Sequence, residues 1–254
     1  MFLRCYRFLK LNLPGFLPGF VCPLLACVIA VSAAVGAAAQ NNNIVNLETS
    51  LGLIQIELRP DVAPGHVQNF LNYVNDGDYD NSFIHRSING FIIQGGGFNY
   101  IDGIFDFVPV DTPITNEFAL SNVRGTIAMA KVGSDPNSAT SQWFINQADN
   151  SANLDFQNGG FTVFGSVIKG MDVVDAIAAL PVINTGTAIG TAMPVRNTPF
   201  DDPVDWSKHL VMVNSTVQVS YPVPMVPAGV ALLLLAMFGL IRYLVRPSGL
   251  IKTA

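Results

Sequence analysis

The side chains that could do chemistry gather in two short segments of the chain. The first, 83–97, places Arg86 among apolar residues, and Gln94 follows eight positions later. The second places Gln142 and Phe144 in a similar apolar setting. An arginine stays charged near neutral pH and offers several fixed N–H donors. The chemistry that this set favours is electrostatic stabilisation by a cation.

The geometry of a strand would bring these side chains together. Alternate residues of a β-strand share a face, so Ile92 and Gln94 point to one side. The same rule puts Gln142 and Phe144 on one side. Such faces could build an apolar groove that holds one guanidinium and two amides. Arg86 could equally be a surface charge, with the amides satisfying backbone groups, and the pattern alone favours neither interpretation.

Other kinds of reaction centre lack their motifs in this sequence. There is no His-Glu-x-x-His zinc motif and no Gly-x-Ser-x-Gly nucleophile elbow. The three histidines lie far apart, without the spacing of metal ligands. The run Gly95–Gly97 is not followed by Lys and Ser or Thr, so it indicates a bulge or a close backbone approach rather than a phosphate loop. We therefore expect no metal, no cofactor and no evident nucleophile.

The distribution of charge and cysteine narrows the function further. Of the 254 residues, only 12% are charged. All 18 acidic residues but only seven basic ones lie within 40–220, which gives this stretch a charge of 7 − 18 = −11. An acidic globule repels phosphates, which argues against nucleic acid as a partner. All three cysteines lie within 1–39, which excludes a thiol nucleophile, a disulfide scaffold or a Cys-ligated metal elsewhere.

The first 39 residues are typical of a secretory signal peptide. Arg4, Arg7 and Lys10 form a basic start, an apolar stretch follows, and Ala37–Ala39 provides a small-residue cleavage site. An uncleaved membrane anchor and a lipoprotein attached at Cys27 are the alternatives. The signal-peptide interpretation predicts a protein that is exported across the cytoplasmic membrane.

The last segment, 221–254, is predicted to be a transmembrane helix with a basic tail. Its uncharged run is about 21 residues long, enough to span a bilayer core of roughly 30 Å. Basic residues follow this run and would stay in the cytoplasm, which leaves the preceding globule outside. The segment also loosely resembles PEP-CTERM-type sorting signals, and a plain membrane anchor is the alternative. The predicted location is the periplasmic or cell-surface face of a bacterial membrane.

The intervening domain, 40–220, is dominated by short strand-like segments. Apolar residues recur at helical spacing in Pro64–Asn75 and Met171–Leu180, which predicts two helices. The stretch 181–205 is rich in Thr, Gly and Pro and predicts a long surface loop. The pattern favours a mainly β domain, a closed eight-stranded antiparallel barrel capped by two α-helices. The eight predicted strands are Asn43–Thr49, Leu53–Leu58, Phe83–Arg86, Phe91–Gln94, Thr126–Ala130, Gln142–Asn146, Phe161–Val167 and Leu210–Val219.

At these residues the sequence resembles the cyclophilins, which are peptidyl-prolyl cis-trans isomerases. Segment 83–97 matches the family signature Phe-His-Arg-x-Ile-x-Gly-Phe-x-Gln-Gly-Gly, with Ile84 inserted. The resemblance covers about 45–219 and is closest to the short periplasmic bacterial branch. Three further motifs follow in the family's order and spacing, at 124–130, 138–146 and 161–165.

The resemblance implies the barrel fold and gives roles to single residues. Arg86 would be the catalytic arginine. Gln94 and Gln142 would hydrogen-bond the substrate backbone or hold this arginine, and Ala130 and Lys131 would line the edge of the groove. The proline pocket would be lined by apolar side chains, namely Phe91, Ile92, Phe144, Leu154 and Phe161.

The chain departs from the family pattern at several positions, and two of these departures bear on what the groove binds. Lys131-Val132 stands where many members have Asn-Ala, which predicts an altered peptide preference. Asn153 occupies the position of the family's groove tryptophan, or phenylalanine in bacterial members. The loss of that aromatic ring puts tight cyclosporin binding in doubt, but it leaves Arg86 and the pocket residues in place.

The predicted reaction is rotation about the X-Pro peptide bond. This bond resists rotation by about 18–20 kcal/mol because the nitrogen lone pair is delocalised into the carbonyl. The cis and trans forms differ by only about 0.5–1 kcal/mol, so the problem is kinetic. A guanidinium at the prolyl nitrogen would favour the twisted bond over both planar forms. We expect proline-containing polypeptides as partners and a monomeric domain; a proline-binding chaperone with little turnover is the alternative.

Overall fold

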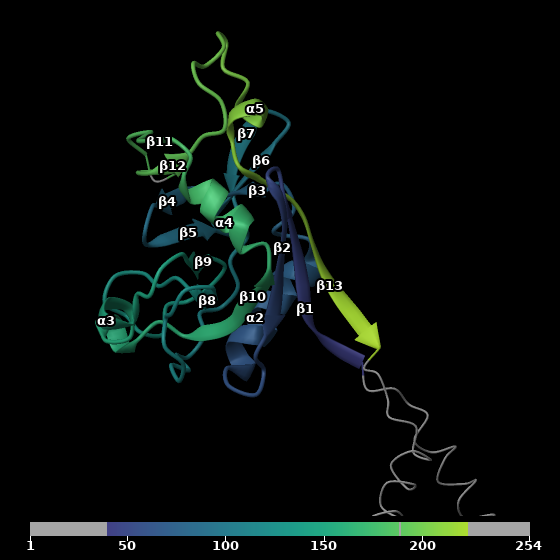
Figure 1. The fold of residues 1–254 in the computed structure, drawn as a ribbon, viewed down its shortest axis with the longest axis vertical. Coiled ribbons are helices and arrows are strands. Elements are labelled where there is room, and N and C mark those ends of the chain that lie inside the picture. Colours follow the sequence, from purple (N-terminus) through teal and green to yellow (C-terminus); the bar gives the residue numbers. More distant parts are fainter. Residues whose placement is uncertain (1–39, 188, 223–254) are drawn as a thin grey trace, which may run out of the picture. The chain divides into compact units, whose positions relative to one another are not determined.

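The computed structural model describes residues 40–187 and 189–222 (Figure 1). Within this part of the chain, Asn41–Tyr221 form one compact unit. The predicted signal peptide (1–39) and nearly all of the predicted anchor (221–254) lie outside the described residues. Among the helices of the described part, none has both the length and the apolar character that a membrane crossing requires.

Strands dominate the described residues, as the sequence predicts. The second strand alternates between buried and more exposed positions, with Ile54, Ile56 and Leu58 buried. This period of two arises because successive side chains of a strand point to opposite faces. The strands are β1 Gln40–Thr49, β2 Gly52–Leu58, β3 Ser82–Phe83, β4 Arg86–Ile88, β5 Ile92–Gly95, β6 Phe98–Ile101, β7 Ile104–Phe107, β8 Thr126–Met129, β9 Trp143–Asn146, β10 Val163–Lys169, β11 Val182–Ile183, β12 Met193–Pro194 and β13 Met212–Pro222.

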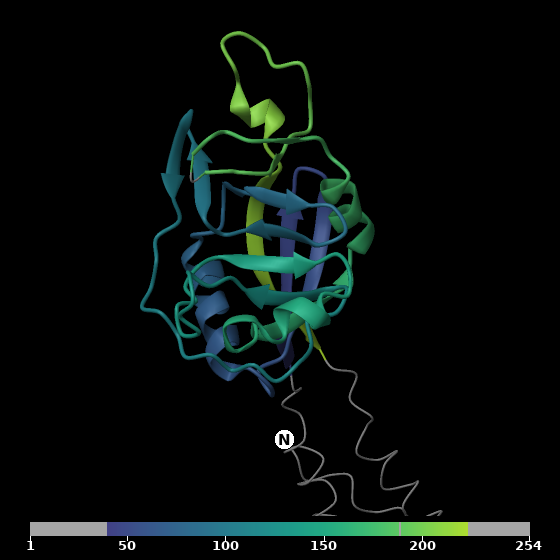
Figure 2. The same cartoon turned by 90° about the vertical axis from the view of Figure 1, so that its left-hand side faces the viewer.

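Eleven of these strands form one sheet in the order β4-β5-β9-β8-β10-β2-β1-β13-β3-β6-β7. The sheet curls as a half-barrel, and a separate two-stranded sheet pairs β11 with β12 (Figures 1 and 2). The mainly β fold is therefore confirmed, but the expectation of a closed sheet of eight strands is confirmed only in this coarser form.

The eleven-stranded sheet has three strands more than the eight predicted, and they arise at two places. The predicted strand Phe83–Arg86 is divided, because Ile84 donates its N–H to the Val211 carbonyl at 2.9 Å while His85 donates its N–H to the Gln94 carbonyl at 3.1 Å. The stretch therefore changes partner between β3 and β4. The β6–β7 hairpin was not predicted from the sequence.

Both predicted helices are confirmed, as α2 and α4. Helix α2 begins at Pro64, whose missing N–H suits a first turn, and it ends at Gly77, whose φ of 75° lies in the left-handed region. Helix α4 follows Gly170, where a Cβ would collide with the Leu53 carbonyl oxygen. Helix α2 packs against β10, and α4 packs against β2 and β5. The helical segments are α2 Pro64–Asp76, α3 Ser151–Leu154, η1 Gln157–Gly159, α4 Met171–Ala178 and α5 Trp206–His209.

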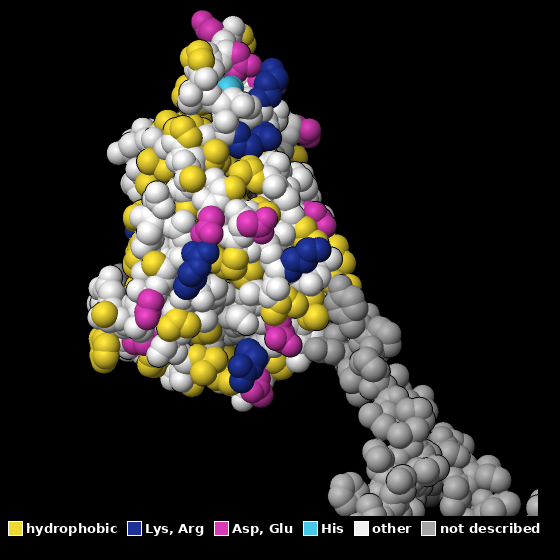
Figure 3. Space-filling model, in the orientation of Figure 1, with side chains coloured by type: hydrophobic (Ala, Val, Ile, Leu, Met, Phe, Trp, Pro, Cys, Tyr) yellow, Lys and Arg dark blue, Asp and Glu magenta, His cyan; other side chains and the backbone are white. Residues whose placement is uncertain are grey.

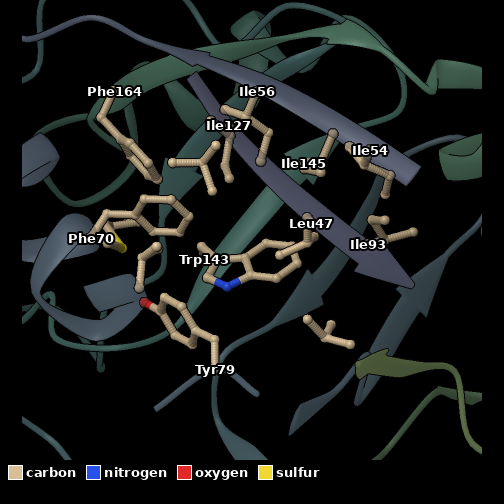
Figure 4. Close-up of a cluster of buried hydrophobic side chains, with 14 of the residues drawn as sticks. Leu47, Ile54, Ile56, Phe70, Tyr79, Ile93, Ile127, Trp143, Ile145 and Phe164 are labelled. Carbon is tan, nitrogen blue, oxygen red and sulfur yellow. The ribbon is translucent and has the colours of Figure 1, made fainter. Parts of the chain in front are cut away.

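The interior core lies on the concave side of the curled sheet, and Figure 4 shows its largest members. Trp143 lies at its centre and is fully buried. A Cβ at Gly96 would lie 2.8 Å from the Trp143 ring, so the close backbone approach predicted for the glycine run is confirmed. The interior core includes Leu47, Ile54, Ile56, Phe70, Tyr79, Ile93, Ile127, Trp143, Ile145 and Phe164.

The stretch 181–205 is more ordered than the predicted surface loop. It contains β11 and β12, and Met193 and Val195 are completely buried. Its Ala192 carbonyl accepts a hydrogen bond from the Ser87 backbone N–H at 2.8 Å. The loop therefore braces β4, the strand that carries Arg86, a role that its polar composition did not indicate.

The surface of the domain carries mixed charge. On the face drawn in Figure 3, acidic and basic side chains are interspersed. Several exposed basic side chains form ion pairs with nearby carboxylates, for example Arg124 with Asp175 at 2.7 Å. The same holds for Arg59 with Asp61 and for Lys208 with Asp201.

Candidate active site

One row of side chains crosses five neighbouring strands on the outer face of the sheet. Arg86 on β4 pairs in register with Gln94 on β5. Gln94 pairs with Phe144 on β9, which pairs with Ala128 on β8. Ala128 in turn pairs with Val163 on β10. Residues directly opposite each other share a face of the sheet. The row therefore runs from a cation at one end to apolar side chains at the other, and Figure 2 shows these strands side by side.

The polar end of the row is joined by side-chain hydrogen bonds. Arg86 Nη1 donates to Gln94 Oε1 at 3.2 Å, and Gln94 Nε2 donates to Gln142 Oε1 at 2.8 Å. The structure therefore brings together three predicted site residues from three different strand regions. It also shows the contacts of the two amides: Gln94 accepts a hydrogen bond from the guanidinium, and Gln142 accepts one from Gln94.

The electrostatic state of Arg86 is unusual for a surface arginine. Its side chain is half-buried, and this burial lowers the pKa of the guanidinium. Within the part of the chain that the structure describes, Arg86 forms no ion pair with a carboxylate. A partly desolvated and uncompensated cation interacts strongly with any electron-rich atom placed beside it. The interpretation of Arg86 as a plain surface charge does not fit this setting.

The apolar end of the row belongs to a second cluster, here called the groove cluster. Phe144 and Phe161 are its aromatic centre, with ring centroids 5.6 Å apart and planes at 75°. Phe144 is buried, whereas Phe91 and Phe161 remain partly exposed, so the cluster reaches the surface of the domain. The cluster contains all the residues predicted for the proline pocket. Its members are Phe91, Ile92, Leu120, Ala128, Ala130, Phe144, Leu154, Phe161 and Val163.

Lys131 lies at the edge of the groove cluster, but its ammonium group is already engaged. Nζ donates to the Asn158 carbonyl at 2.8 Å and to the Gly160 carbonyl at 2.7 Å. It also lies 4.7 Å from the centroid of the Phe161 ring, a cation–π distance. Burial lowers the pKa of Lys131. Lys131 therefore fastens the loop that presents Phe161.

A buried asparagine network supports the cluster, and the sequence did not indicate it. Asn150 donates to the Phe91 carbonyl at 2.9 Å and to Asn146 Oδ1 at 2.7 Å. Asn146 donates to Asn122 Oδ1 at 3.2 Å, and Asn122 donates to the Phe161 carbonyl at 3.0 Å. The backbones of Phe91 and Phe161, two partly exposed aromatic members of the cluster, are thus tied together. The only sequence signal was a set of asparagines close to the recognised motifs.

Comparison with known proteins agrees with this geometry. The family model described as "Cyclophilin type peptidyl-prolyl cis-trans isomerase/CLD" matches residues 44–198. A peptidyl-prolyl cis-trans isomerase of Acinetobacter baylyi is 46% identical over 155 residues, which cover 60% of this chain and 80% of the relative. Peptidyl-prolyl cis-trans isomerase B of Escherichia coli is 41% identical over 166 residues, covering 63% and 94% of the two chains.

A solved structure supports the fold independently. The cyclophilin-type isomerase of Cryptosporidium parvum, determined in the presence of the dipeptide Ala-Pro, superposes with a TM-score of 0.52 at 23% identity. The match covers 70% of this chain and 99% of that one. The row of side chains, the family match and the relatives lead to one conclusion: the chain belongs to the cyclophilin-type peptidyl-prolyl cis-trans isomerases and has their activity.

Proposed function

We propose that the groove accelerates X-Pro rotation by placing the Arg86 guanidinium at the prolyl nitrogen while the groove cluster holds the proline ring. The observation that carries the proposal is the half-buried arginine. It has no carboxylate partner among the described residues, and it begins the row that passes through Gln94 to Phe144. Twisting the bond localises a lone pair on nitrogen, so a fixed N–H donor there stabilises the twisted state more than either planar one.

The hydrogen bonds around Arg86 support this role. A guanidinium has five N–H donors. Within the described part of the chain, Arg86 donates one of them to the Gln94 side chain. The bond to Gln94 fixes the plane of the guanidinium, and the other side-chain donors can face a substrate. Pre-arranged donors need no reorganisation during the reaction, which makes them effective in a site that is partly dry.

The substrate assignment follows from the shape and polarity of the groove cluster. Phe144 and Phe161 form an edge-to-face pair whose open side suits a small apolar ring. Gln142 borders this pocket and offers an amide to the peptide backbone next to the proline. The Ala-Pro dipeptide named for the Cryptosporidium parvum structure supports a short X-Pro sequence as the minimal ligand. The proposed substrates are therefore proline-containing polypeptides.

We also propose that the curled sheet closes into the eight-stranded barrel of the short bacterial branch. The stretch 82–88 supports this, because β3 pairs with β13 and β4 pairs with β5. If residues 82–88 are counted as one strand, this strand pairs with β5 on one side and with β13 on the other. It then links the first and last strands of the order β5-β9-β8-β10-β2-β1-β13 and makes the eighth strand of a closed barrel. Closure predicts that the N–H groups of Ile84 and His85 are protected from hydrogen exchange as well as those of β5.

The proposed location is outside the cytoplasmic membrane, with the isomerase domain held by its C-terminal segment. The support is the signal-like segment 1–39 and the uncharged run with a basic end in 221–254. In this location the clients would be secreted and envelope proteins. The segment 221–254 would then act either as a plain membrane anchor or as a sorting signal of the PEP-CTERM type. Protease added to spheroplasts should remove the domain; a fully protected domain would overturn the orientation.

The catalytic proposal is tested with an isomerisation assay on residues 40–220. Arg86→Ala should lower kcat/KM for an Ala-Pro peptide by about 100-fold or more, the usual effect of removing one transition-state donor. Arg59→Ala is the matched control, because Arg59 is exposed and paired with Asp61. Unchanged activity of the Arg86 variant would remove this residue from the mechanism, and an inactive wild type would overturn the proposal as a whole.

A further inference from the structure

The β6–β7 hairpin is fixed to the domain through one of its two faces. Its four aromatic residues share this face, because Phe98 pairs in register with Phe107 and Tyr100 pairs with Phe105. The ring of Phe105 meets that of Phe83 edge-on, with centroids 5.7 Å apart, and Phe83 and Phe98 are buried. The hairpin is therefore a fixed platform on the fold.

The turn and the outer edge of the hairpin present apolar side chains to solvent. Ile101 pairs with Ile104 at the turn, and these two residues are 48% and 67% exposed. Phe107 at the end of β7 and Val110 just after it are also exposed. These four residues are here called the hairpin patch. Exposed apolar side chains that gather on one element, unlike single ones, indicate a binding surface.

The base of the hairpin lies against the polar end of the groove. The Val108 N–H donates to the Gly97 carbonyl at 3.1 Å and closes the base. A Cβ at Gly97 would lie 3.0 Å from Nε2 of Gln142, so the backbone here touches the amide that borders the proposed pocket. Figure 2 shows the hairpin projecting from the left-hand side of the domain. A polypeptide that leaves the groove at its polar end therefore meets the hairpin next.

Acidic side chains surround the hairpin patch. Asp102 and Asp106 belong to the hairpin, and Asp111 follows Val110. The stretch 98–123 contains four acidic residues and neither Lys nor Arg. None of the three aspartates takes part in an ion pair within the described residues. This negative charge repels a second copy of the same hairpin and attracts a segment that carries basic residues.

We propose that the hairpin patch is a second binding site for the client polypeptide and takes a segment in which apolar residues alternate with basic ones. The proposal rests on the proposed isomerase function and deepens it, since the groove would bind the X-Pro pair and the hairpin would bind the chain some residues away. A strand rises about 3.3 Å per residue, so Ile101, four residues beyond Gly97, is reached by client residues roughly four to six positions from the proline.

The test measures KM of the full-length chain for three peptides. One is a short Ala-Pro peptide, and the other two extend it by about six residues on each side, with leucine alternating with lysine or with glutamate. KM for the Leu-Lys peptide should be about tenfold lower than for the short peptide, because apolar burial and charge attraction add to the contacts of the groove. The Leu-Glu peptide should gain no more than about twofold. Equal KM values for the two extended peptides would overturn the proposal.

Two double variants separate the apolar part of the surface from its charge. Ile101→Ser with Ile104→Ser should reduce the advantage of the Leu-Lys peptide over the short one to about twofold. Ile168→Ser is the matched control, an exposed isoleucine of β10, and should leave the advantage unchanged. Asp102→Asn with Asp111→Asn should abolish the preference for lysine over glutamate, and about 0.5 M salt should weaken this preference in the wild type. A full advantage retained in the isoleucine variant would overturn the proposal.

Two further measurements distinguish the proposal from its alternatives. If the hairpin patch joined two copies of the chain, sedimentation would show a wild-type dimer and a monomeric Ile101→Ser, Ile104→Ser variant, which would overturn the proposal. Titration calorimetry measures binding of the extended peptides without turnover. An inactive wild type that still prefers the Leu-Lys peptide would count against the isomerase mechanism while supporting the hairpin patch.

Discussion

The two faces of β9 show how one strand can serve two purposes. Trp143 and Ile145 point into the interior core and are completely buried. Phe144, between them, points outward into the groove cluster, whose neighbour Phe161 is partly exposed. Successive side chains of a strand face opposite ways, so a shift of one residue separates the face that stabilises the fold from the face that binds. Substitutions of adjacent residues should therefore have separable effects.

The interior core and the outer row also differ in the interactions that hold them together. The interior core consists of buried, mostly apolar side chains. At the polar end of the outer row, by contrast, side-chain hydrogen bonds connect Arg86, Gln94 and Gln142. In an apolar core, a substitution lowers stability when it changes the volume of the side chain. In a chain of side-chain hydrogen bonds, a substitution is costly when it removes a donor or an acceptor. The predictions below test this difference, beginning with the interior.

Removal of the central interior ring should have the largest effect. Trp143→Ala should lower the free energy of unfolding by about 3–5 kcal/mol, because it deletes a fully buried aromatic side chain and leaves a cavity. Urea unfolding followed by circular dichroism measures this. The fraction that stays folded should still bind a proline peptide, and a loss of binding in that fraction would contradict the separation of the two faces.

The buried ring of His85 should also make stability depend on pH. Burial, followed by the charge of Arg86, lowers the pKa of His85 from 6.5 to about 4 in the folded state. Between these values the unfolded chain binds a proton that the folded chain does not, so stability is lost as pH falls from 6.5 to 4. Each pH unit in this window is worth about 1.4 kcal/mol, which gives a loss of up to about 3 kcal/mol.

The pH effect is measured by urea unfolding at pH 7 and pH 4.5. His66 contributes in the same direction, because burial lowers its pKa beside Glu117. The control is His85→Gln, which cannot titrate and should lose part of the pH dependence. An identical pH dependence in this variant and in wild type would contradict the pKa assigned to His85.

Substitution on the outer face of β9 should act on binding more than on folding. Phe144→Ala should raise KM for an Ala-Pro peptide by about 10-fold or more, since a buried aromatic side chain contributes about 1.5–3 kcal/mol of apolar contact. Its stability loss should be smaller than that of Trp143→Ala, because Phe144 packs in a smaller cluster whose members Phe91 and Phe161 are partly exposed. The two variants are compared by peptide kinetics and by urea unfolding on the same preparations. A larger loss of stability for Phe144→Ala than for Trp143→Ala would contradict the different roles of the two faces of β9.

The smallest effect is expected at the edge of the groove. Lys131→Met keeps the length of the side chain but removes the ammonium that binds two carbonyls of the 158–160 loop and the Phe161 ring. Stability should fall by about 0.5–1 kcal/mol and kcat/KM by no more than about threefold. Lys169→Met is an exposed control. A loss of activity as large as that of Phe144→Ala would show that Lys131 touches the substrate.

The elements with regular apolar spacing could be predicted from the sequence, because alternation and helical recurrence are local properties. Helices α2 and α4 and the strands of the interior core follow from them. The hairpin β6–β7 was missed, although Asp102-Gly103 is a turn signal whose positive φ angles of 51° and 84° close it. Its exposed apolar residues, such as Ile104, do not alternate with polar ones as in a half-buried strand.

The candidate site was predictable in its residue types and only partly in its connections. Strand alternation placed Gln142 with Phe144, but the register that aligns Arg86, Gln94 and Phe144 depends on pairing between distant segments. The support from Asn122 depends on a contact with Phe161 across 39 residues of chain. Such contacts leave no local pattern, because any polar residue near a motif looks the same in sequence.

The central claim is that Arg86 acts on the twisted bond and not on the bound peptide. Exchange spectroscopy on an Ala-Pro peptide, with binding followed by titration on the same samples, separates these effects most directly. The account predicts that Arg86→Ala binds the peptide with an affinity within about tenfold of wild type while its exchange rate at saturation falls by about 100-fold. An Arg86→Ala domain that exchanges the bound peptide at the wild-type rate would contradict the account.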